Sequence, residues 1–276
     1  MIYVTKFDGS KQLFSKEKII RTCLRMRASL EQAKIIADKI EKKAYDGIST
    51  KEILKMIFSF IKEFRPEVSY LIDLREAIAM LRPKPDFEQY IARLLQEHGY
   101  QVITNQIVQG KCVDHEVDII AKGDREIIYV EVKHHIQAHT YTGLDVFLEV
   151  KAALDDLKKG YEMKNNVFNF NKALVVCNTK ISDHAKRFAS CENIEYLGWR
   201  APENKGIESL IEEKKLYPIT FLKILKPIET FALLNSGVIT LKDLVKSNLH
   251  DLKRKTHIKE KRLNEILRVA SEILES

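Results

Sequence analysis

The sequence predicts a chain of three parts in the α and α/β classes. We expect a mostly helical N-terminal domain over residues 1–82, a central α/β/α sheet domain over 83–214 and a small helical domain over 215–276. Three observations predict this layout. Apolar residues recur at helical spacing in the first part, strand-like and helical runs alternate in the second, and the third contains helical patterns throughout. The Pro-containing stretch 82–85 cannot be regular helix and separates the first two parts.

The first part opens with a short strand over 2–4 and a turn at 8–10. Helical patterns follow over 19–24 and 33–44. Ser49, with Glu52 three residues later, forms a capping box that starts a third helix. Pro66 suits a first helical position, and the apolar residues of 71–78 continue one face.

The central part begins with a helix that Asp86 is expected to cap and Gly99 to stop. Three strand-like runs come next, a long amphipathic helix begins after Gly143, and a buried strand, a helix from Ser182 and a last strand complete the order. The strand runs cover 100–108, 113–121, 126–132, 173–177 and 194–197. The order strand, helix, strand, helix, strand is typical of an α/β sheet with a right-handed crossover. The last part carries short helices around 231–234, 241–245 and 262–273.

Composition excludes several classes of protein. Apolar residues make up 45% and charged residues 31%, with only 10 Gly and 6 Pro, so disordered and collagen-like chains are excluded. No apolar run reaches the roughly 18 residues that a membrane span needs, and no signal-peptide pattern is visible. The 4 cysteines contain no CxxC pair, which argues against a zinc ribbon or a disulfide framework. We therefore expect a cytoplasmic protein without membrane contact.

Charge is unevenly divided along the chain. Residues 1–85 carry 18 Lys and Arg against 11 Asp and Glu, residues 86–214 carry 16 against 21, and residues 215–276 carry 12 against 7. An acidic catalytic centre between polyanion-binding arms would give this pattern. Uneven surface charge without a partner would also give it.

The strongest chemical signal lies between Asp118 and Lys133. If the two strands form a hairpin with a two-residue loop at 124–125, counting back places Asp118 directly opposite Glu131. Opposed residues of antiparallel strands point to one face, and Lys133 shares that face by alternation. Two opposed carboxylates repel each other, and a divalent cation offsets the repulsion best, although protonation and Lys133 itself would also help.

Oxygen-only ligands suit Mg²⁺ or Mn²⁺, and the lysine amine would orient or deprotonate a water and stabilise charge on a phosphorus. These are the parts that phosphodiester hydrolysis requires. The alternative is a solvated hairpin face that carries Asp, Glu and Lys without a catalytic role.

This segment resembles the PD-(D/E)xK nuclease superfamily. The sequence Phe87-Glu88, Leu94-Leu95 and His98-Gly99-Tyr100 ahead of the acidic strand is similar to the Mrr-type, restriction-endonuclease-like branch, over about 86–200. The resemblance implies metal-dependent cleavage of DNA, with Asp118 and Glu131 as metal ligands and Lys133 as the catalytic lysine. It also implies that Glu88, on the first helix, supports the metal site. A helix N-terminal glutamate favoured by the helix dipole is the alternative.

The opening Val4-Thr5-Lys6-Phe7-Asp8-Gly9-Ser10, with Lys18 and the helices up to about 81, resembles the ATP-cone domain. The resemblance implies binding of ATP or dATP, with Val4, Lys6 and Lys18 at nucleotide-contacting positions. Phe7, Gln12 and Ser15 differ from the family's usual residues. A cone that folds without binding nucleotide therefore stays an alternative.

The segment 231–244 resembles a helix-hairpin-helix or related DNA-binding module. A basic band lies beside it, and neutralising phosphates there would add salt-sensitive affinity for DNA. The band comprises Lys253, Arg254, Lys255, Lys259, Lys261 and Arg262, along with His257. A solvated run of charge is the alternative.

Together these features predict a Mg²⁺-dependent endodeoxyribonuclease acting on duplex DNA, with ATP or dATP as an effector bound by the cone. The alternative function is a non-cleaving, nucleotide-responsive DNA-binding protein that keeps the nuclease fold. Cleavage of RNA or of branched DNA would need the same site chemistry. Whether the chain works as a homodimer stays open at this stage.

Overall fold

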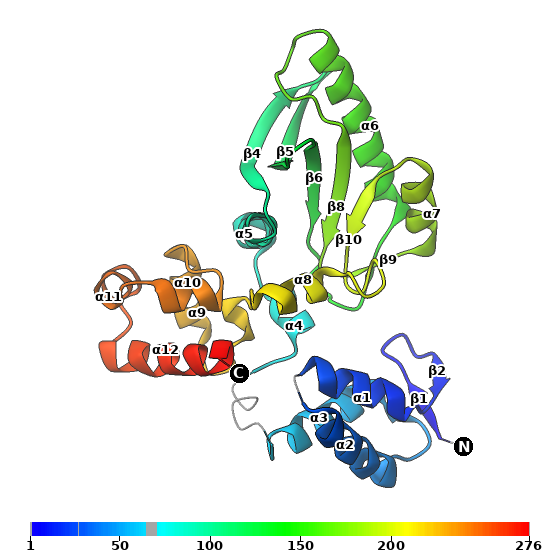
Figure 1. Cartoon of the computed structure of the whole chain (residues 1–276), viewed down its shortest axis with the longest axis vertical. Helices are drawn as coiled ribbons and strands as arrows, with labels where there is room; N and C mark the ends of the chain where they lie inside the picture. The colour runs from blue at the N-terminus through cyan, green and yellow to red at the C-terminus, as the bar shows by residue number, and fades with distance from the viewer. Residues whose placement is uncertain (1, 27, 65–70, 276) are drawn as a thin grey trace. The chain divides into compact units, whose positions relative to one another are not determined.

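A computed structural model describes residues 2–26, 28–64 and 71–275. The chain divides into two compact units, one over 1–71 and one over 72–276 (Figure 1). The expected sequence of a helical N-terminal domain, a central sheet domain and C-terminal helices is confirmed. Among the described helices, none is both long and apolar enough to cross a membrane.

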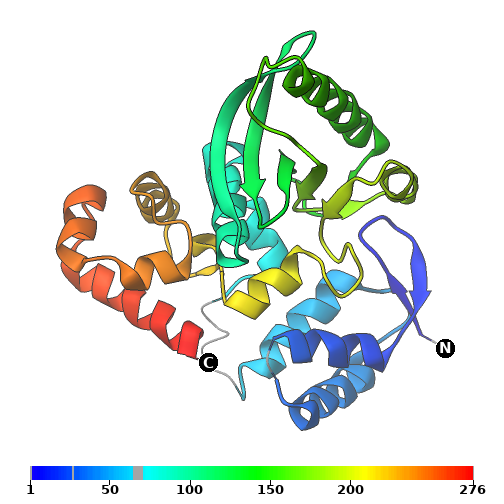
Figure 2. The ribbon, with the colours of Figure 1, turned by 45° about the horizontal axis from the view of Figure 1, so that its top comes forward.

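The first unit packs helices beside a small sheet. The sheet has the order β2-β1-β3, with β1 and β2 paired as an antiparallel hairpin, drawn in dark blue in Figure 2. Isoleucines and alanines of the three helices form its core. Ser49 caps α3 as predicted, accepting a hydrogen bond from the Glu52 amide at 3.0 Å, whereas the Glu52 side chain, expected to complete a capping box, accepts from the Tyr45 hydroxyl at 2.8 Å. The elements are β1 (Tyr3–Thr5), β2 (Lys11–Leu13), α1 (Lys16–Arg25), α2 (Leu30–Lys43), β3 (Ile48–Ser49) and α3 (Thr50–Ile61).

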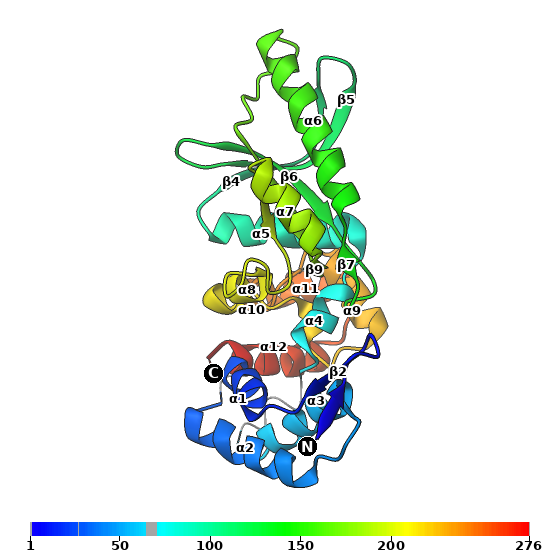
Figure 3. The ribbon, with the colours of Figure 1, turned by 90° about the vertical axis from the view of Figure 1, so that its right-hand side faces the viewer.

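The second unit is built on a mixed sheet of order β10-β8-β6-β5-β4. Strands β4, β5 and β6 form an antiparallel meander, and β6, β8 and β10 run parallel through the crossover helices. Helix α5 lies on one face of the sheet, and α6 and α7 lie on the other (Figure 3). The elements of this domain are α4 (Leu74–Ala79), α5 (Glu88–Glu97), β4 (Gln101–Gln109), β5 (Asp114–Lys122), β6 (Ile127–Lys133), β7 (Tyr141–Thr142), α6 (Leu144–Glu162), β8 (Lys172–Cys177), β9 (Lys180–Ile181), α7 (Asp183–Cys191) and β10 (Glu195–Leu197).

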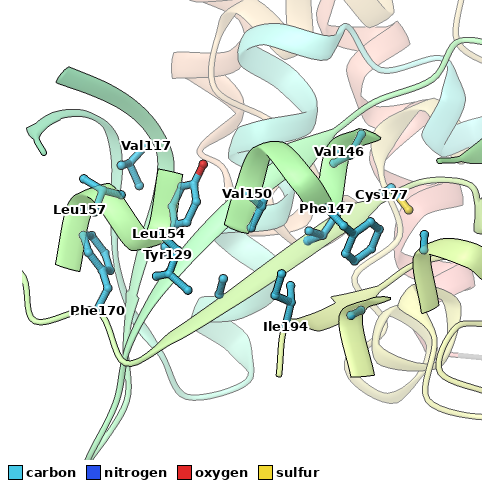
Figure 4. Packing of buried hydrophobic residues seen from close by; sticks show 14 of the residues in the cluster. Val117, Tyr129, Val146, Phe147, Val150, Leu154, Leu157, Phe170, Cys177 and Ile194 are labelled. Carbon is cyan, nitrogen blue, oxygen red and sulfur yellow. The ribbon is translucent and has the colours of Figure 1, made fainter. Parts of the chain in front are cut away.

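The main core lies between the sheet and α6. Phe147, Val150 and Leu154 of α6 pack toward Tyr129 on β6 and Ile194, which precedes β10 (Figure 4). The 3.6-residue spacing of the apolar residues places them on one helix face, as the sequence pattern predicts. This packing fixes β6, the strand that carries the Glu-x-Lys motif.

The C-terminal helices and the sheet domain belong to the same compact unit. Tyr90 of α5 donates a buried hydrogen bond to the Leu216 carbonyl at 2.8 Å, and Thr220 donates one to the Ala77 carbonyl at 2.6 Å. These bonds tie the C-terminal helices to the start of the sheet domain. The elements are α8 (Ile207–Lys214), a short turn of helix at Ile219–Phe221, α9 (Pro227–Asn235), α10 (Leu241–Lys246), α11 (Leu249–Thr256) and α12 (Glu260–Glu275).

Several local predictions need correction. Asp86 does not cap α5, because it lies in a turn over Pro83–Phe87 and its carboxylate accepts hydrogen bonds from the Arg82 guanidinium at 2.6 and 2.7 Å. The short strands β2, β3, β7 and β9 and the helices α8 and α11 are absent from the sequence-based prediction. Asp73 caps the helix that the 71–78 pattern indicates, which begins at Leu74. The predicted helix start at Pro66 lies outside the described residues.

Candidate active site

The β5–β6 hairpin sets the relative position of the two predicted carboxylates. The Gly123 amide donates to the Glu126 carbonyl at 2.9 Å and closes the two-residue loop. The ladder then pairs Lys122 with Ile127 and continues to Ile119 with Val130. The regular pairing ends there, one residue short of Asp118 and Glu131, so the register expected from the loop length holds as far as Ile119 and Val130. The Val132 amide donates to Asp118 Oδ2 at 2.8 Å and holds that carboxylate against β6.

Glu131 is held by two donors within a mostly buried environment. The Tyr129 hydroxyl donates to its Oε2 at 2.9 Å, and the Lys133 ammonium lies 3.2 Å from its Oε1. Burial raises the pKa of the Glu131 carboxyl, and the negative charge of Asp118 raises that pKa further. The site therefore places an acidic group where its ionised form is costly, which is typical of sites that bind cations or move protons.

Lys133 lies beside Glu131 on the same face of β6. Burial lowers its pKa, but the nearby carboxylates of Glu131 and Glu149 outweigh that effect, so that the pKa of Lys133 is raised overall. Lys133 is thus an ammonium at neutral pH in this arrangement. It can donate hydrogen bonds and stabilise negative charge, and the deprotonation of water considered from the sequence is disfavoured here.

Glu88, the first residue of α5, reaches the same site from the opposite face of the sheet. Its side chain is 3% exposed, and its Oε1 accepts no well-aligned hydrogen bond from the described residues, although the Lys84 ammonium lies 3.1 Å away. Burial raises the pKa of the Glu88 carboxyl; Lys84 opposes that rise and Asp118 adds to it. The Lys84 ammonium is thus the charged partner of this buried oxygen, although the two atoms form no well-aligned hydrogen bond.

Lys84 is the principal site residue that sequence reasoning missed. Its ammonium lies 2.7 Å from Glu116 Oε1 and 3.3 Å from Asp118 Oδ1, besides its contact with Glu88. Hydrogen bonding to Glu116 raises the pKa of Lys84 above its ordinary value. The available signal is its position just before the helix that carries Glu88, but the Pro-containing stretch 82–85 by itself predicts only a linker.

The donor set suits a hard divalent cation. Asp118, Glu131 and Glu88 offer carboxylate oxygens only, which Mg²⁺ and Mn²⁺ prefer. Within the described ranges, no group of three or more His, Cys, Asp or Glu side chains is already arranged around a common metal position. The ammonium of Lys84 among Glu116, Glu88 and Asp118 shows that the cluster attracts positive charge. The chemistry of the donor atoms therefore fits the predicted cation, whereas the arrangement of the described side chains does not yet form a metal site.

The predicted nucleotide-contacting residues lie on the β1–β2 hairpin and the helix that follows it. Val4 is buried on β1 opposite Gln12, and Lys18 in the first turn of α1 donates to the Gln12 side chain at 2.8 Å. Lys6 lies past the end of β1, where its amide donates to the Ser10 carbonyl at 2.8 Å. The structure thus brings Val4, Gln12 and Lys18 together and places Lys6 in the hairpin loop.

The basic band of the C-terminal helices consists mainly of exposed side chains. Lys253, Arg254 and Lys255 form the last turn of α11, and Lys259 and Lys261 flank the start of α12. Lys253 pairs with Glu260 and Arg254 with Asp251, both at the surface. Arg262 differs from the others, because it is 24% exposed and pairs at 2.9 Å with Glu229, in addition to donating to the Ile224 carbonyl. Its guanidinium is therefore part of the helical packing.

Three family models match successive parts of the chain. A model described as ATP cone domain matches residues 2–70, one described as restriction endonuclease matches 82–197, and one described as AF1548-like, C-terminal, matches 217–274. The resemblances to the ATP-cone domain and to the restriction-endonuclease-like branch are thereby confirmed.

A related sequence and a solved structure extend the comparison. The chain is 36% identical over 184 residues to an uncharacterized protein of Archaeoglobus fulgidus. This match covers 67% of this chain and 99% of the relative. It is also similar to the crystal structure of AF1548, a protein of unknown function. That match has a TM-score of 0.57 and 34% identity and covers 74% of this chain and 100% of the other.

Proposed function

The chain belongs to the AF1548-like family, with a restriction-endonuclease-like domain ahead of the family's C-terminal domain, and we propose that it is a metal-dependent endodeoxyribonuclease. The observation that carries the proposal is that Asp118 and Glu131 lie on the two strands of one hairpin, with the Asp118 carboxylate bound by the Val132 amide and with Lys133 beside Glu131. This trio stands within the part of the chain that matches the restriction-endonuclease family.

Asp118 and Glu131 are proposed as the metal ligands, with Glu88 in support. A divalent cation bound by these carboxylates would polarise a phosphate oxygen and lower the pKa of a bound water. The Tyr129 hydroxyl fixes the Glu131 carboxylate, and the Val132 amide fixes that of Asp118, so both carboxylates are oriented before any ligand arrives.

Lys133 is proposed to contact the phosphate that is cleaved. Its side chain is 36% exposed, so that its ammonium can reach a ligand while it remains within 3.2 Å of Glu131. A fixed positive charge stabilises the additional negative charge that develops on the phosphoryl oxygens as water attacks. Because the pKa of Lys133 is raised, this charge is present throughout the neutral pH range.

Duplex DNA is the proposed substrate. The exposed cations on α11 and at the start of α12, namely Lys253, Arg254, Lys255, Lys259 and Lys261, are proposed to bind phosphates without reading sequence. Arg262 is left out of this surface because its guanidinium holds Glu229.

ATP or dATP is the proposed effector of the N-terminal cone. The match of residues 2–70 to the ATP-cone family supports this proposal, as does the position of Lys18 in a helix first turn. A lysine near a helix start provides positive charge for phosphates, and here it is the Lys18 ammonium that does so, because the Lys18 amide donates to the Ser15 side chain. Val4, Lys6 and Lys18 are the residues proposed to contact the nucleotide.

The experiment that tests the activity compares substrates and cofactors in one panel. Purified full-length protein is incubated with plasmid, linear, single-stranded and branched DNA and with RNA, in Mg²⁺, Mn²⁺ or EDTA, with and without ATP or dATP. We expect cleavage of plasmid and linear duplex DNA in Mg²⁺ or Mn²⁺ and none in EDTA. DNA binding without cleavage of any substrate would favour a nucleotide-responsive DNA-binding protein, and cleavage of RNA alone would change the substrate.

A further inference from the structure

We propose that Lys84 is an internal counter-ion of the acidic cluster, and that a divalent cation must displace its ammonium from Glu88 and Asp118 in order to bind. This inference rests on the proposed metal-dependent function. It adds a residue that the paired carboxylates and the Glu-x-Lys motif do not include, and it assigns that residue an effect on metal affinity.

The contacts of Lys84 bridge three carboxylates. Its Nζ lies 2.7 Å from Glu116, 3.1 Å from Glu88 and 3.3 Å from Asp118. The side chains of Glu88 and Asp118 are 3% and 8% exposed, whereas that of Glu116 is 58% exposed. Two buried like charges beside each other are costly without a cation, so the ammonium stabilises this arrangement in the absence of metal.

The two lysines of the site divide the cluster between them. Lys133 lies 3.2 Å from Glu131 and 3.9 Å from Glu149, on the β6 side. Lys84 faces Asp118 and Glu88 from the other side. Displacing Lys84 therefore frees oxygens of Glu88 and Asp118 while Lys133 stays beside Glu131, in the position proposed for phosphate contact.

The surroundings of Lys84 permit such an exchange without movement of the backbone. Arg82 anchors the preceding residues through hydrogen bonds to Asp86 and to Asn235. The Lys84 side chain itself is 54% exposed and flexible, and Glu116 lies at the rim of the cluster. The ammonium can thus leave the two buried carboxylates and keep its contact with Glu116.

Competition of this kind lowers the apparent affinity for metal. If Lys84 occupies the cluster about nine-tenths of the time, the metal-competent fraction is about one-tenth and the apparent Kd is about tenfold higher. Removal of the Lys84 charge should lower the apparent Kd for metal by about the same factor. A residue that merely positions the carboxylates would have the opposite effect, because its loss would loosen the ligands.

The test measures Mn²⁺ binding to the full-length protein by isothermal titration calorimetry, without DNA. We expect Lys84→Gln to bind Mn²⁺ about tenfold more tightly than the unchanged protein and to melt at a lower temperature in EDTA. Lys84→Arg, which keeps the charge, should bind Mn²⁺ with nearly the original affinity. Lys84→Met provides a second neutral variant of similar length if the glutamine variant does not fold.

Lys172→Gln is the matched control. Lys172 also bridges two carboxylates, Glu126 at 2.6 Å and Glu195 at 3.1 Å, on the same sheet but outside the cluster. Its loss should leave the Kd for Mn²⁺ unchanged. If Lys172→Gln tightened Mn²⁺ binding as much as Lys84→Gln, the effect would not depend on the position of Lys84, and the inference would be overturned.

The outcomes separate this inference from the proposed function. Unchanged or weaker Mn²⁺ binding by Lys84→Gln, when the unchanged protein does bind Mn²⁺, would overturn the role of Lys84 and leave the metal site intact. Absence of Mn²⁺ binding in the unchanged protein and in both neutral variants would overturn the metal site itself and the inference with it.

Discussion

Replacement of Tyr129 by Phe probes the electrostatics of the candidate site directly. Tyr129 is 3% exposed, and its hydroxyl donates to Glu131 Oε2 at 2.9 Å. The variant keeps the aromatic ring, which packs edge-on against Phe170 at 6.2 Å between ring centroids, and removes only the donor. Of the two donors that hold the Glu131 carboxylate, the Lys133 ammonium at 3.2 Å then remains.

The expected loss of stability follows from this geometry. A hydrogen bond to a charged group contributes about 1.5–3 kcal/mol, and we place this one near 2 kcal/mol because Lys133 partly compensates. For a unit of this size, 2 kcal/mol corresponds to a drop in Tm of roughly 4–8 °C. Urea unfolding at pH 8 measures the free energy, and a thermal scan measures the shift.

The loss of stability in Tyr129→Phe should depend on pH, in a direction that follows from the pKa of Glu131. Burial raises the pKa of Glu131 in the folded protein, and the Tyr129 hydrogen bond lowers that pKa by favouring the ionised form. Without the donor, the folded-state pKa rises further above the unfolded value of about 4.3. The stability that protonated Glu131 contributes is therefore fully present below the pKa of the unfolded chain and is lost as the pH rises through the pKa of the folded protein. The difference between variant and unchanged protein should therefore be larger at pH 8 than at pH 5.

Tyr100→Phe is the matched control. The Tyr100 hydroxyl donates to Glu126 at 3.0 Å, but Lys172 holds the same carboxylate at 2.6 Å. We expect this variant to lose no more than about 1 kcal/mol. Equal stability of Tyr129→Phe and the unchanged protein at pH 8, or a loss that does not change between pH 5 and pH 8, would refute this description of Glu131.

Two further predictions address the flanking domains. Saturating ATP or dATP should raise the Tm of the full-length protein, because a ligand at 100 times its Kd adds about 2.7 kcal/mol to the folded state. Replacing Lys6 and Lys18 by Ala should remove that shift, as thermal scans would show. Replacing Lys253 and Lys255 by Gln should weaken binding to duplex DNA and reduce the slope of log K against log salt by about 1.8, because each lost phosphate contact changes it by about 0.9. Titration of labelled DNA at several salt concentrations measures this slope.

Each of these predictions has its own contradicting result. The absence of any Tm shift with millimolar ATP or dATP would mean that the cone folds without binding nucleotide. For the C-terminal surface, the control is replacement of the exposed Lys42 and Lys51 by Gln, which should leave the slope unchanged. Equal slopes for the unchanged protein and the α11 variant would remove that helix from DNA binding.

The geometry of the hairpin could be predicted from the sequence because loop length fixes register. A two-residue loop at 124–125 leaves one pairing, and the ladder follows it from Lys122 with Ile127 to Ile119 with Val130, next to Asp118 and Glu131. Glu88 was reached through the family resemblance, since nothing in its local sequence indicates that its helix starts beside this hairpin.

Only the contact with Glu88 is local, four residues along the chain; the other two contacts of Lys84 are long-range and could not be predicted in the same way. It meets Glu116 and Asp118 across 32 and 34 residues, and no periodic pattern encodes such a distance. Asp86 was misassigned for a related reason: a capping residue and a partner for Arg82 look alike until the turn that joins them is known. Helix α11 was missed because only Leu252 and Thr256 are buried along it, too few for a clear apolar stripe.

The central claim is that Asp118 and Glu131 carry metal-dependent cleavage of DNA. The direct measurement is plasmid cleavage in Mg²⁺ and Mn²⁺ by the unchanged protein, by Asp118→Asn and Glu131→Gln, and by Asp183→Asn, whose side chain is 91% exposed on α7 away from the hairpin. We expect cleavage by the unchanged protein and by Asp183→Asn, and none by the two site variants, although all four fold and bind DNA. Full cleavage by either site variant, or cleavage by the unchanged protein in EDTA, would contradict the claim.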